Sequence, residues 1–491
     1  MLFNSLIFIL VFLPVVLGVF YWLGARFPKR VPMLWLTLAS LFYYGWWDLN
    51  YVPLIVGSCV FNYFLGRKIG RSLKSKRQWL AVGVAVNLLL LGYFKYAIFS
   101  IEILNTIFST DYSIAKIILP LAISFFTFQQ ITYLVDVHRG KAKNYDFQDY
   151  MLFVCFFPQL IAGPIVHHGE MMPQFGRDNT YRFDHKRLAV GLSIFAIGLA
   201  KKVLVADSLS KYSTLAFAAV GEGEGLYVIE AWVGALAYTF QLYFDFSGYS
   251  DMAIGIAWMF GIRLPENFFS PYQSTNLVEF WRRWHITLSR FLRDYLYIPL
   301  GGNKKGEIRR NINLLLTMVI GGIWHGAGWT FVVWGGVHGL WLAATHHFGK
   351  YFEAVRRCNL KVVGGLLTFW FVVSAWVLFR SPDIATAVNY LQNMYAQPEW
   401  LAVGHPGIFK DRLIGVMVAL ILVCYYLPNT QQLFGDHHPS IPSAQLCPEE
   451  RTAKVNLVWR PTIKWAGLVM ILLLTCILSL QKRSEFLYYQ F

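Results

Sequence analysis

The sequence predicts an all-α integral membrane protein that crosses the bilayer many times. Its 491 residues are 56% hydrophobic and only 14% charged, whereas a soluble domain carries roughly 25% charged residues. Apolar segments long enough to cross about 30 Å of hydrocarbon recur along the whole chain. Aromatic residues make up 17% of the sequence and gather at segment ends, as in Tyr43–Trp47, where membrane interfaces favour them.

The apolar segments define the expected elements in order. We expect about 11–13 transmembrane helices, with spans at residues 5–24, 32–47, 52–65, 79–98, 117–136, 188–206, 227–246, 312–324, 329–346, 361–379, 411–427 and 463–480. Two further apolar segments, 150–166 and 247–262, are interrupted by Gly and Pro. Irregular backbone is tolerated at membrane depth only inside protein, so we expect these two segments to be re-entrant or kinked.

The basic loops set the expected orientation. The first apolar segment has no Lys or Arg before Arg26, so it lacks the positively charged start of a cleavable signal peptide. Basic residues cluster directly after it, then at 67–77 and at 138–143, and two spans separate each cluster from the next. Because positive charge favours cytoplasmic loops, the N-terminus is expected to be periplasmic.

The chain is expected to form one membrane domain, 1–491. Within it we distinguish the N-terminal spans at 1–136, a core at 137–346 with most of the candidate functional residues, and the C-terminal spans at 347–491. The longest hydrophilic stretches are 381–410 and 428–460. Both are too short for a separate domain of at least about 50 residues.

The net charge of +16 has two explanations. The first is that basic residues gather in cytoplasmic loops, next to anionic lipid. The second is that they form a positively charged funnel for a polyanionic substrate. The funnel is favoured by nine basic residues: Arg263, Arg282, Arg283, Arg290, Arg293, Lys304, Lys305, Arg309 and Arg310. Nucleic acid is not an expected partner, because no soluble domain could present a groove-reading element. The six cysteines are scattered singly, without metal or disulfide spacing.

His325 is the first candidate for a catalytic residue. It lies between the apolar runs 313–324 and 329–344, so we expect it at membrane depth, where ionisable groups mark functional sites. The glycines around it leave room for a substrate. A neutral histidine there is suited to deprotonate a hydroxyl. The alternative is a histidine bonded to a neighbouring helix, with the glycines serving helix packing.

A second histidine, His285, lies in the aromatic and basic stretch 280–293, which we expect to be one helix. On such a helix Trp281 and Ser289 are its neighbours at spacing four. The alternative is an interfacial helix that carries His285 on its polar face.

Acidic and hydroxyl side chains gather in the stretch 243–251. On a helix Asp245 and Tyr249 share one face, and Ser247 and Asp251 share another. Buried carboxylates of this kind more often organise hydrogen bonds than catalyse. One span after His325 lies His338, for which we also favour a structural role.

Several motifs together resemble the membrane-bound O-acyltransferase family, and within it the bacterial branch of alginate O-acetyltransferases. They extend over most of the chain, at residues 119–126, 135–140, 157–164, 241–255, 279–303 and 322–326, with the ending 486–491. The loop 428–460, which contains His437 and His438, has no role that this resemblance explains.

The resemblance implies helices that enclose a tunnel through the membrane, with catalytic His325 near its middle and His285 at a second family position. It implies an O-acyltransferase without a bound cofactor. The acyl donor would be cytosolic acetyl-CoA, with its phosphates on the basic segment 282–310. Further residues expected at the substrate or tunnel are Asp245, Ser247, Tyr249, Trp281, Arg282, Arg293, Asp294, Asn303, Trp324 and His338.

The resemblance also implies a bacterial inner-membrane location and a periplasmic partner similar to an SGNH hydrolase. The partner would complete the O-acetylation of an exported polysaccharide, with alginate as the first candidate and peptidoglycan, cellulose and teichoic acid as alternatives. Direct transfer to a hydroxyl of the partner is favoured, because no Cys or Ser stands in a nucleophile-and-base pattern. A transporter or flippase and a structural anchor remain as non-enzymatic alternatives.

Overall fold

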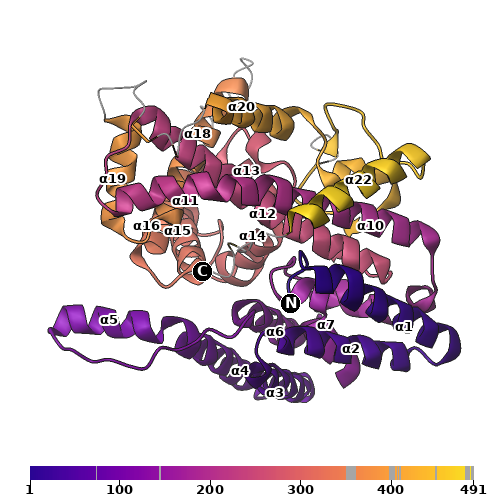
Figure 1. Ribbon diagram of the computed structural model, residues 1–491. Coiled ribbons are helices and arrows are strands. Elements are labelled where there is room, and N and C mark those ends of the chain that lie inside the picture. Colours follow the sequence, from indigo (N-terminus) through magenta and orange to yellow (C-terminus); the bar gives the residue numbers. More distant parts are fainter. Residues whose placement is uncertain are drawn as a thin grey trace.

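The protein is described here by a computed structural model, shown in Figure 1. It covers residues 1–72, 74–142, 145–349, 361–396, 404–405, 407, 411–447, 451–480 and 487. Cys358 and all of the ending 486–491 except Leu487 lie outside these residues. The described chain is helical apart from loops and two strands of two residues each, β1 and β2. This confirms the predicted all-α class.

The N-terminal helices form the lower group in Figure 1. In order they are α1 (Leu13–Arg26), α2 (Arg30–Gly45), α3 (Val52–Arg71), α4 (Lys76–Leu91), α5 (Ala97–Phe108), α6 (Ile123–His138), α7 (Phe147–Cys155), α8 (Phe157–Leu160) and α9 (His168–Phe175). A π-helical turn, η1 (Phe8–Phe12), precedes α1, and another, η3 (Gly92–Tyr96), joins α4 to α5.

The remaining helices form the upper group. They are α10 (His185–Ala200), α11 (Asp207–Gly221), α12 (Val228–Met259), α13 (Leu277–Arg283), α14 (Ile286–Leu292), α15 (Gly306–His325), α16 (Trp329–His347), α18 (Lys361–Arg380), α19 (Ile384–Tyr395), α20 (Asp411–Tyr426), α21 (Thr430–Leu433) and α22 (Ile463–Ser479). Two π-helical turns, η5 (Lys201–Ala206) and η7 (Arg293–Tyr297), follow α10 and α14.

Five continuous helices of the described chain are long and apolar enough to cross a membrane. They are Phe8–Arg26, Leu49–Arg71, Lys76–Phe108, His185–Gly221 and Lys361–Arg380. The helix from Lys76 extends well past the predicted span 79–98, and Ser109, in a left-handed conformation, ends it. The predicted span 117–136 is helical only from Ile123 onward.

Helix α12 lies between the two largest hydrophobic clusters of the fold. Its first half packs with α11, α13, α16 and α18, and its second half packs with the N-terminal helices. A helix that is apolar on every side is expected at such a central position. Segment 247–262 was expected to be re-entrant or kinked, and the re-entrant alternative was wrong, because α12 continues without a break to Met259.

The glycines that interrupt the apolar segment 247–262 do not end the helix, because they serve its packing. A Cβ on Gly248 would lie 2.7 Å from the Gly198 carbonyl oxygen, and a Cβ on Gly255 would lie 2.6 Å from that of Gly191. These glycines let α12 approach α10 closely, as small residues do in membrane helix pairs. The segment 150–166 is interrupted as predicted, by the short helices α7 and α8 and a loop.

The described part of the loop 428–460, to which no role was assigned from the sequence, packs against the segment that follows α12. Its strand β2 (Ser440–Ile441) pairs in parallel with β1 (Leu264–Pro265). Arg451 makes two hydrogen bonds, of 3.0 and 2.9 Å, with the carboxylate of Glu266. The loop is therefore part of the fold around the segment that follows α12.

Candidate active site

His325 is the last residue of α15, at the tip of the hairpin that α15 forms with α16. The hairpin is tight because glycines face the partner helix: a Cβ on Gly339 would lie 2.8 Å from the Cα of Leu315. The His325 side chain is buried, and the centroid of its ring lies 5.4 Å from that of Trp334 and 5.2 Å from that of Phe379. Both contacts are edge-to-face, so aromatic packing fixes the imidazole.

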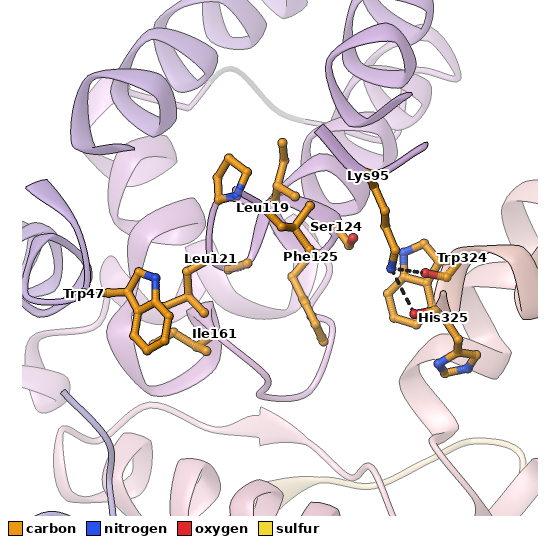
Figure 2. A pocket seen from close by; sticks show the side chains of 12 residues that line it. Trp47, Lys95, Leu119, Leu121, Ser124, Phe125, Ile161, Trp324 and His325 are labelled. Carbon is orange, nitrogen blue, oxygen red and sulfur yellow. Dashed lines mark hydrogen bonds between the residues drawn. The ribbon is translucent and has the colours of Figure 1, made fainter. Parts of the chain in front are cut away.

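A small cavity of about 120 Å³ reaches His325 from the N-terminal group of helices. We call it the Lys95 cavity. Its lining residues are Trp47, Lys95, Leu119, Pro120, Leu121, Ala122, Ile123, Ser124, Phe125, Ile161, Trp324 and His325. Figure 2 shows Lys95 on one side of this cavity, with its amine bonded to the carbonyl groups of Trp324 and His325.

A second and larger cavity, of about 620 Å³, lies among α13, α14, α15 and α16. We call it the basic cavity. Its polar lining residues are Arg282, Ser289, Arg293, Tyr297, Asn303, Arg310, Thr317, His346 and Gln445. Its size falls within the range of about 300–1,000 Å³ that is typical of small-molecule sites. Gln445 comes from the loop 428–460, which thus forms part of the wall.

Three aromatic side chains lie between the basic cavity and His325. Trp281 lines that cavity, and its ring centroid lies 5.3 Å from that of His338 and 5.9 Å from that of Trp334. Trp334 in turn contacts His325. We call Trp281, Trp334 and His338 the aromatic layer. His325 therefore lines the Lys95 cavity and is separated from the basic cavity by one layer of side chains.

His285 does not lie on a continuous helix, as the sequence predicted for 280–293. The chain breaks there, because α13 ends at Arg283 and His285 adopts a left-handed conformation with φ 41° before α14 begins. Histidine enters this region more readily than most residues, yet the conformation is uncommon outside functional sites and turns. His285 is also fully buried, which contradicts the alternative of an exposed position on an interfacial helix.

A hydrogen-bond network fixes the His285 ring. Its Nδ1 lies 3.0 Å from the Asn267 Oδ1, which also accepts from the Thr287 hydroxyl at 2.9 Å. The Asn267 amide nitrogen donates to the Ser250 hydroxyl at 3.1 Å. Because Asn267 presents its oxygen to the ring, Nδ1 carries the proton and Nε2 is left as an acceptor. The ring centroid lies 6.3 Å from that of Trp324, on which His325 also packs.

The candidates on α12 are buried away from both cavities. Asp245 pairs with Lys202 at 2.6 Å and accepts the backbone N–H of Leu487 at 3.3 Å. The Tyr249 ring stacks on Phe3 with centroids 4.8 Å apart, and Ser247 is buried. None of the three lines the Lys95 cavity or the basic cavity.

The basic residues of the expected funnel separate into two kinds. Three are neutralised by ion pairs: Arg283 with Glu279 at 2.7 Å, Arg290 with Glu170 at 2.5 Å, and Arg293 with Asp294 at 2.7 Å. Arg282 and Arg310 line the basic cavity, as does the paired Arg293, while Lys304, Lys305 and Arg309 are exposed nearby in the sequence. The charge available to a ligand therefore comes from fewer residues than the sequence count.

Some residues of this region were not found from the sequence. No sequence pattern marked Asn267 or Trp334 as functional, because an amide in a loop and a tryptophan in an apolar run are both common. Lys95 did carry one, since a lysine inside the apolar run 79–98 falls under the rule that intramembrane charges mark sites. No three His, Cys, Asp or Glu side chains of the described chain converge on a possible metal position.

Comparison with known proteins gives consistent matches. Residues 139–382 match the model of the membrane-bound O-acyltransferase family. A peptidoglycan O-acetyltransferase from Helicobacter pylori is 47% identical over 483 residues, which cover 88% of this chain and 90% of the relative. A probable alginate O-acetylase from Pseudomonas putida is 39% identical over 503 residues, covering 100% of both chains. A teichoic acid D-alanyltransferase from Bacillus subtilis is 26% identical over 271 residues, covering 53% of this chain and 68% of the relative.

Proposed function

The chain belongs to the membrane-bound O-acyltransferase family and is a multi-pass membrane enzyme, and from this premise we propose that it moves acetyl groups from cytosolic acetyl-CoA to a hydroxyl acceptor for the O-acetylation of an exported polysaccharide. The observation that carries the proposal is the position of His325. It lies where two cavities of different character approach each other, one large and basic and the other small and mostly apolar.

The basic cavity is the proposed donor site. Coenzyme A carries several phosphate groups, which favour arginine because its guanidinium binds phosphate with two parallel hydrogen bonds. Arg282 and Arg310 both line the cavity, and His346 lies close enough to both for their charges to interact. The acetyl thioester would reach His325 past the aromatic layer, which requires Trp281 to change rotamer.

His325 is the proposed general base. Its imidazole accepts the proton of the acceptor hydroxyl as the hydroxyl oxygen attacks the thioester carbonyl carbon. The carbon–sulfur bond then breaks, and the thiolate of coenzyme A takes the proton back from the imidazolium. A buried site strengthens each of these electrostatic steps, because water does not screen them.

His285 is proposed to assist His325 rather than to react itself. Its Nδ1 is bonded to Asn267, and the two imidazoles lie close enough for their charges to interact. The left-handed backbone at His285 and the bonds to Asn267 hold it in place. A fixed second dipole of this kind lowers the reorganisation needed in the transition state.

The acceptor is proposed to enter through the Lys95 cavity from the periplasmic side. Support comes from the charge pattern, because the basic loops at 26–30, 67–77 and 138–143 favour an N-terminus outside the cytoplasm and a segment 282–310 on the cytoplasmic side. The inner membrane of a bacterium is the corresponding location. A periplasmic partner resembling an SGNH hydrolase would supply the acceptor hydroxyl and finish the ester on the polymer.

Two polymers are the leading acceptors. Relatives named for alginate align with the whole chain at 39% identity, and the relative named for peptidoglycan is 47% identical. The higher identity supports peptidoglycan, and the full-length alignment supports alginate, so both are candidates. Polymer acetylation in cells that lack the protein separates the two, because only the true acceptor loses its O-acetyl groups.

Reconstitution tests the relay. The purified protein is placed in proteoliposomes with acetyl-CoA on the side of the 282–310 segment and polymer on the other side, with and without the periplasmic partner. A Lys304→Cys variant labelled by an impermeant thiol reagent reports which side that segment faces. We expect polymer acetylation only with the partner present. Full acetylation by this chain alone would show that no relay is needed.

A further inference from the structure

The end of α15 presents three backbone carbonyls that the helix itself does not satisfy. A helix leaves its last carbonyl groups without partners, and here these belong to Ile323, Trp324 and His325. Two consecutive residues of another helix supply the missing donors. The Tyr96 hydroxyl donates to the Ile323 carbonyl at 2.9 Å. The Lys95 amine donates to the carbonyls of Trp324 at 2.5 Å and of His325 at 3.0 Å.

The two donors lie on a π-helical turn. The turn η3, Gly92–Tyr96, interrupts the helix Lys76–Phe108. A π turn inserts one extra residue, which changes the direction of the side chains that follow, and such turns are frequent at functional sites. In η3 this places Lys95 and Tyr96 against the tip of the α15–α16 hairpin, as Figure 2 shows for Lys95.

A lysine in this place is not explained by membrane insertion, because a charged group within an apolar span is costly. It suits the end of α15, since the C-terminus of a helix attracts a positive charge. Lys95 also lines the cavity that reaches His325 and lies 5.8 Å from the centroid of the Trp324 ring. The Lys95 side chain thus contacts both Trp324 and His325, the last two residues of α15.

We propose that Lys95, together with Tyr96, is a positioning residue that fixes the last turn of α15 and through it the imidazole of His325. The proposal rests on the proposed role of His325 as the general base. The two donors connect the turn that carries His325 to a helix of the N-terminal group. A shift of about 1 Å in a reacting group costs about 10²-fold in rate.

The test measures steady-state release of coenzyme A during acetyl transfer from acetyl-CoA to the acceptor hydroxyl of the periplasmic partner, catalysed by the purified protein, with separate kcat and KM values. We expect Lys95→Met to lower kcat by about 10²-fold, with KM for acetyl-CoA changed less than about 3-fold because the basic cavity is untouched. Lys95→Arg keeps the donors and is expected to recover much of the loss. Tyr96→Phe removes one bond and is expected to lower kcat less.

Tyr93→Phe is the matched control, because Tyr93 lies on the same π turn but is exposed; its kcat should equal that of the wild type. Combination with His325→Ala gives the decisive result. If Lys95 acts through His325, the double variant Lys95→Met/His325→Ala is no slower than His325→Ala, since the effects of groups that act as a unit are not additive. Independent effects that multiply would overturn the proposal.

The outcomes distinguish the two claims. If His325→Ala keeps its turnover, the proposed function fails and the positioning role fails with it. If His325→Ala is inactive while Lys95→Met and Tyr96→Phe keep the wild-type kcat, only the positioning role is overturned. Should Lys95→Met not yield folded protein, as judged by a monodisperse elution profile, Tyr96→Phe and Lys95→Arg decide the question.

Discussion

Gly335→Ala should disable the enzyme without touching a reacting group. Gly335 lies on α16 where this helix meets α15, and an added Cβ would lie 2.9 Å from the Cα of Val319, with the Met318 carbonyl oxygen closer still. Ordinary van der Waals contact begins at 3.4 Å. The two backbones therefore have to separate by at least the difference, about 0.5 Å, because backbone atoms cannot rotate away as a flexible side chain can.

The separation displaces the helix that ends in His325. Since a misplacement of about 1 Å costs about 10²-fold, we expect kcat for acetyl-CoA turnover to fall by about 10-fold to 100-fold. The matched control is Gly336→Ala on the same helix, where an added Cβ meets nothing within 4 Å. It should keep the wild-type rate. Equal activities of the two variants, at equal expression in membranes, would refute the reasoning that hairpin packing positions His325.

The other predictions concern single side chains. His325→Ala should lower acetyl transfer by about 10²–10⁴-fold, the usual effect of removing a general base, with membrane insertion intact; near-normal polymer acetylation would reject the assignment. His285→Ala should also lower kcat, but less, and a change in thermal stability alone would indicate a structural role. Arg282→Gln should raise KM for acetyl-CoA, and added salt should mimic this because exposed charges are screened; a KM that ignores salt argues against phosphate binding. The hydrogen bond to the Glu230 carboxylate raises the pKa of His405, so the stability from this contact is complete below about pH 6.5 and is lost as pH rises through the raised value. The melting temperature should fall over that window in the wild type and not in His405→Gln.

The sequence predicted the elements better than their contacts. The two apolar runs beside His325 predicted a helix on each side of it, because length and hydropathy indicate such segments, and the structure has α15 ending at His325 and α16 beginning at Trp329. The break at His285 could not be found in this way. It depends on Asn267, which lies 18 residues before His285 in the sequence, and on a left-handed backbone that no local pattern required.

Glycine was the residue most easily misread. Gly248 and Gly255 suggested an interrupted segment, since glycine weakens a helix in isolation. In the fold they are contact points between α10 and α12, and close packing offsets the lost propensity. The charge count was misread for a related reason. Arg283 and Arg290 added to the apparent funnel, yet each is neutralised by a carboxylate whose proximity only the fold reveals.

The aromatic layer has a consequence for the cell as well as for the reaction. Trp281, Trp334 and His338 pack at centroid distances of 4.7 to 5.9 Å. If the two cavities open to opposite faces as proposed, this packed layer insulates the compartments from each other. The acetyl group then passes from donor to acceptor by covalent transfer. The packed side chains block the movement of ions and protons, so the membrane potential is preserved during turnover.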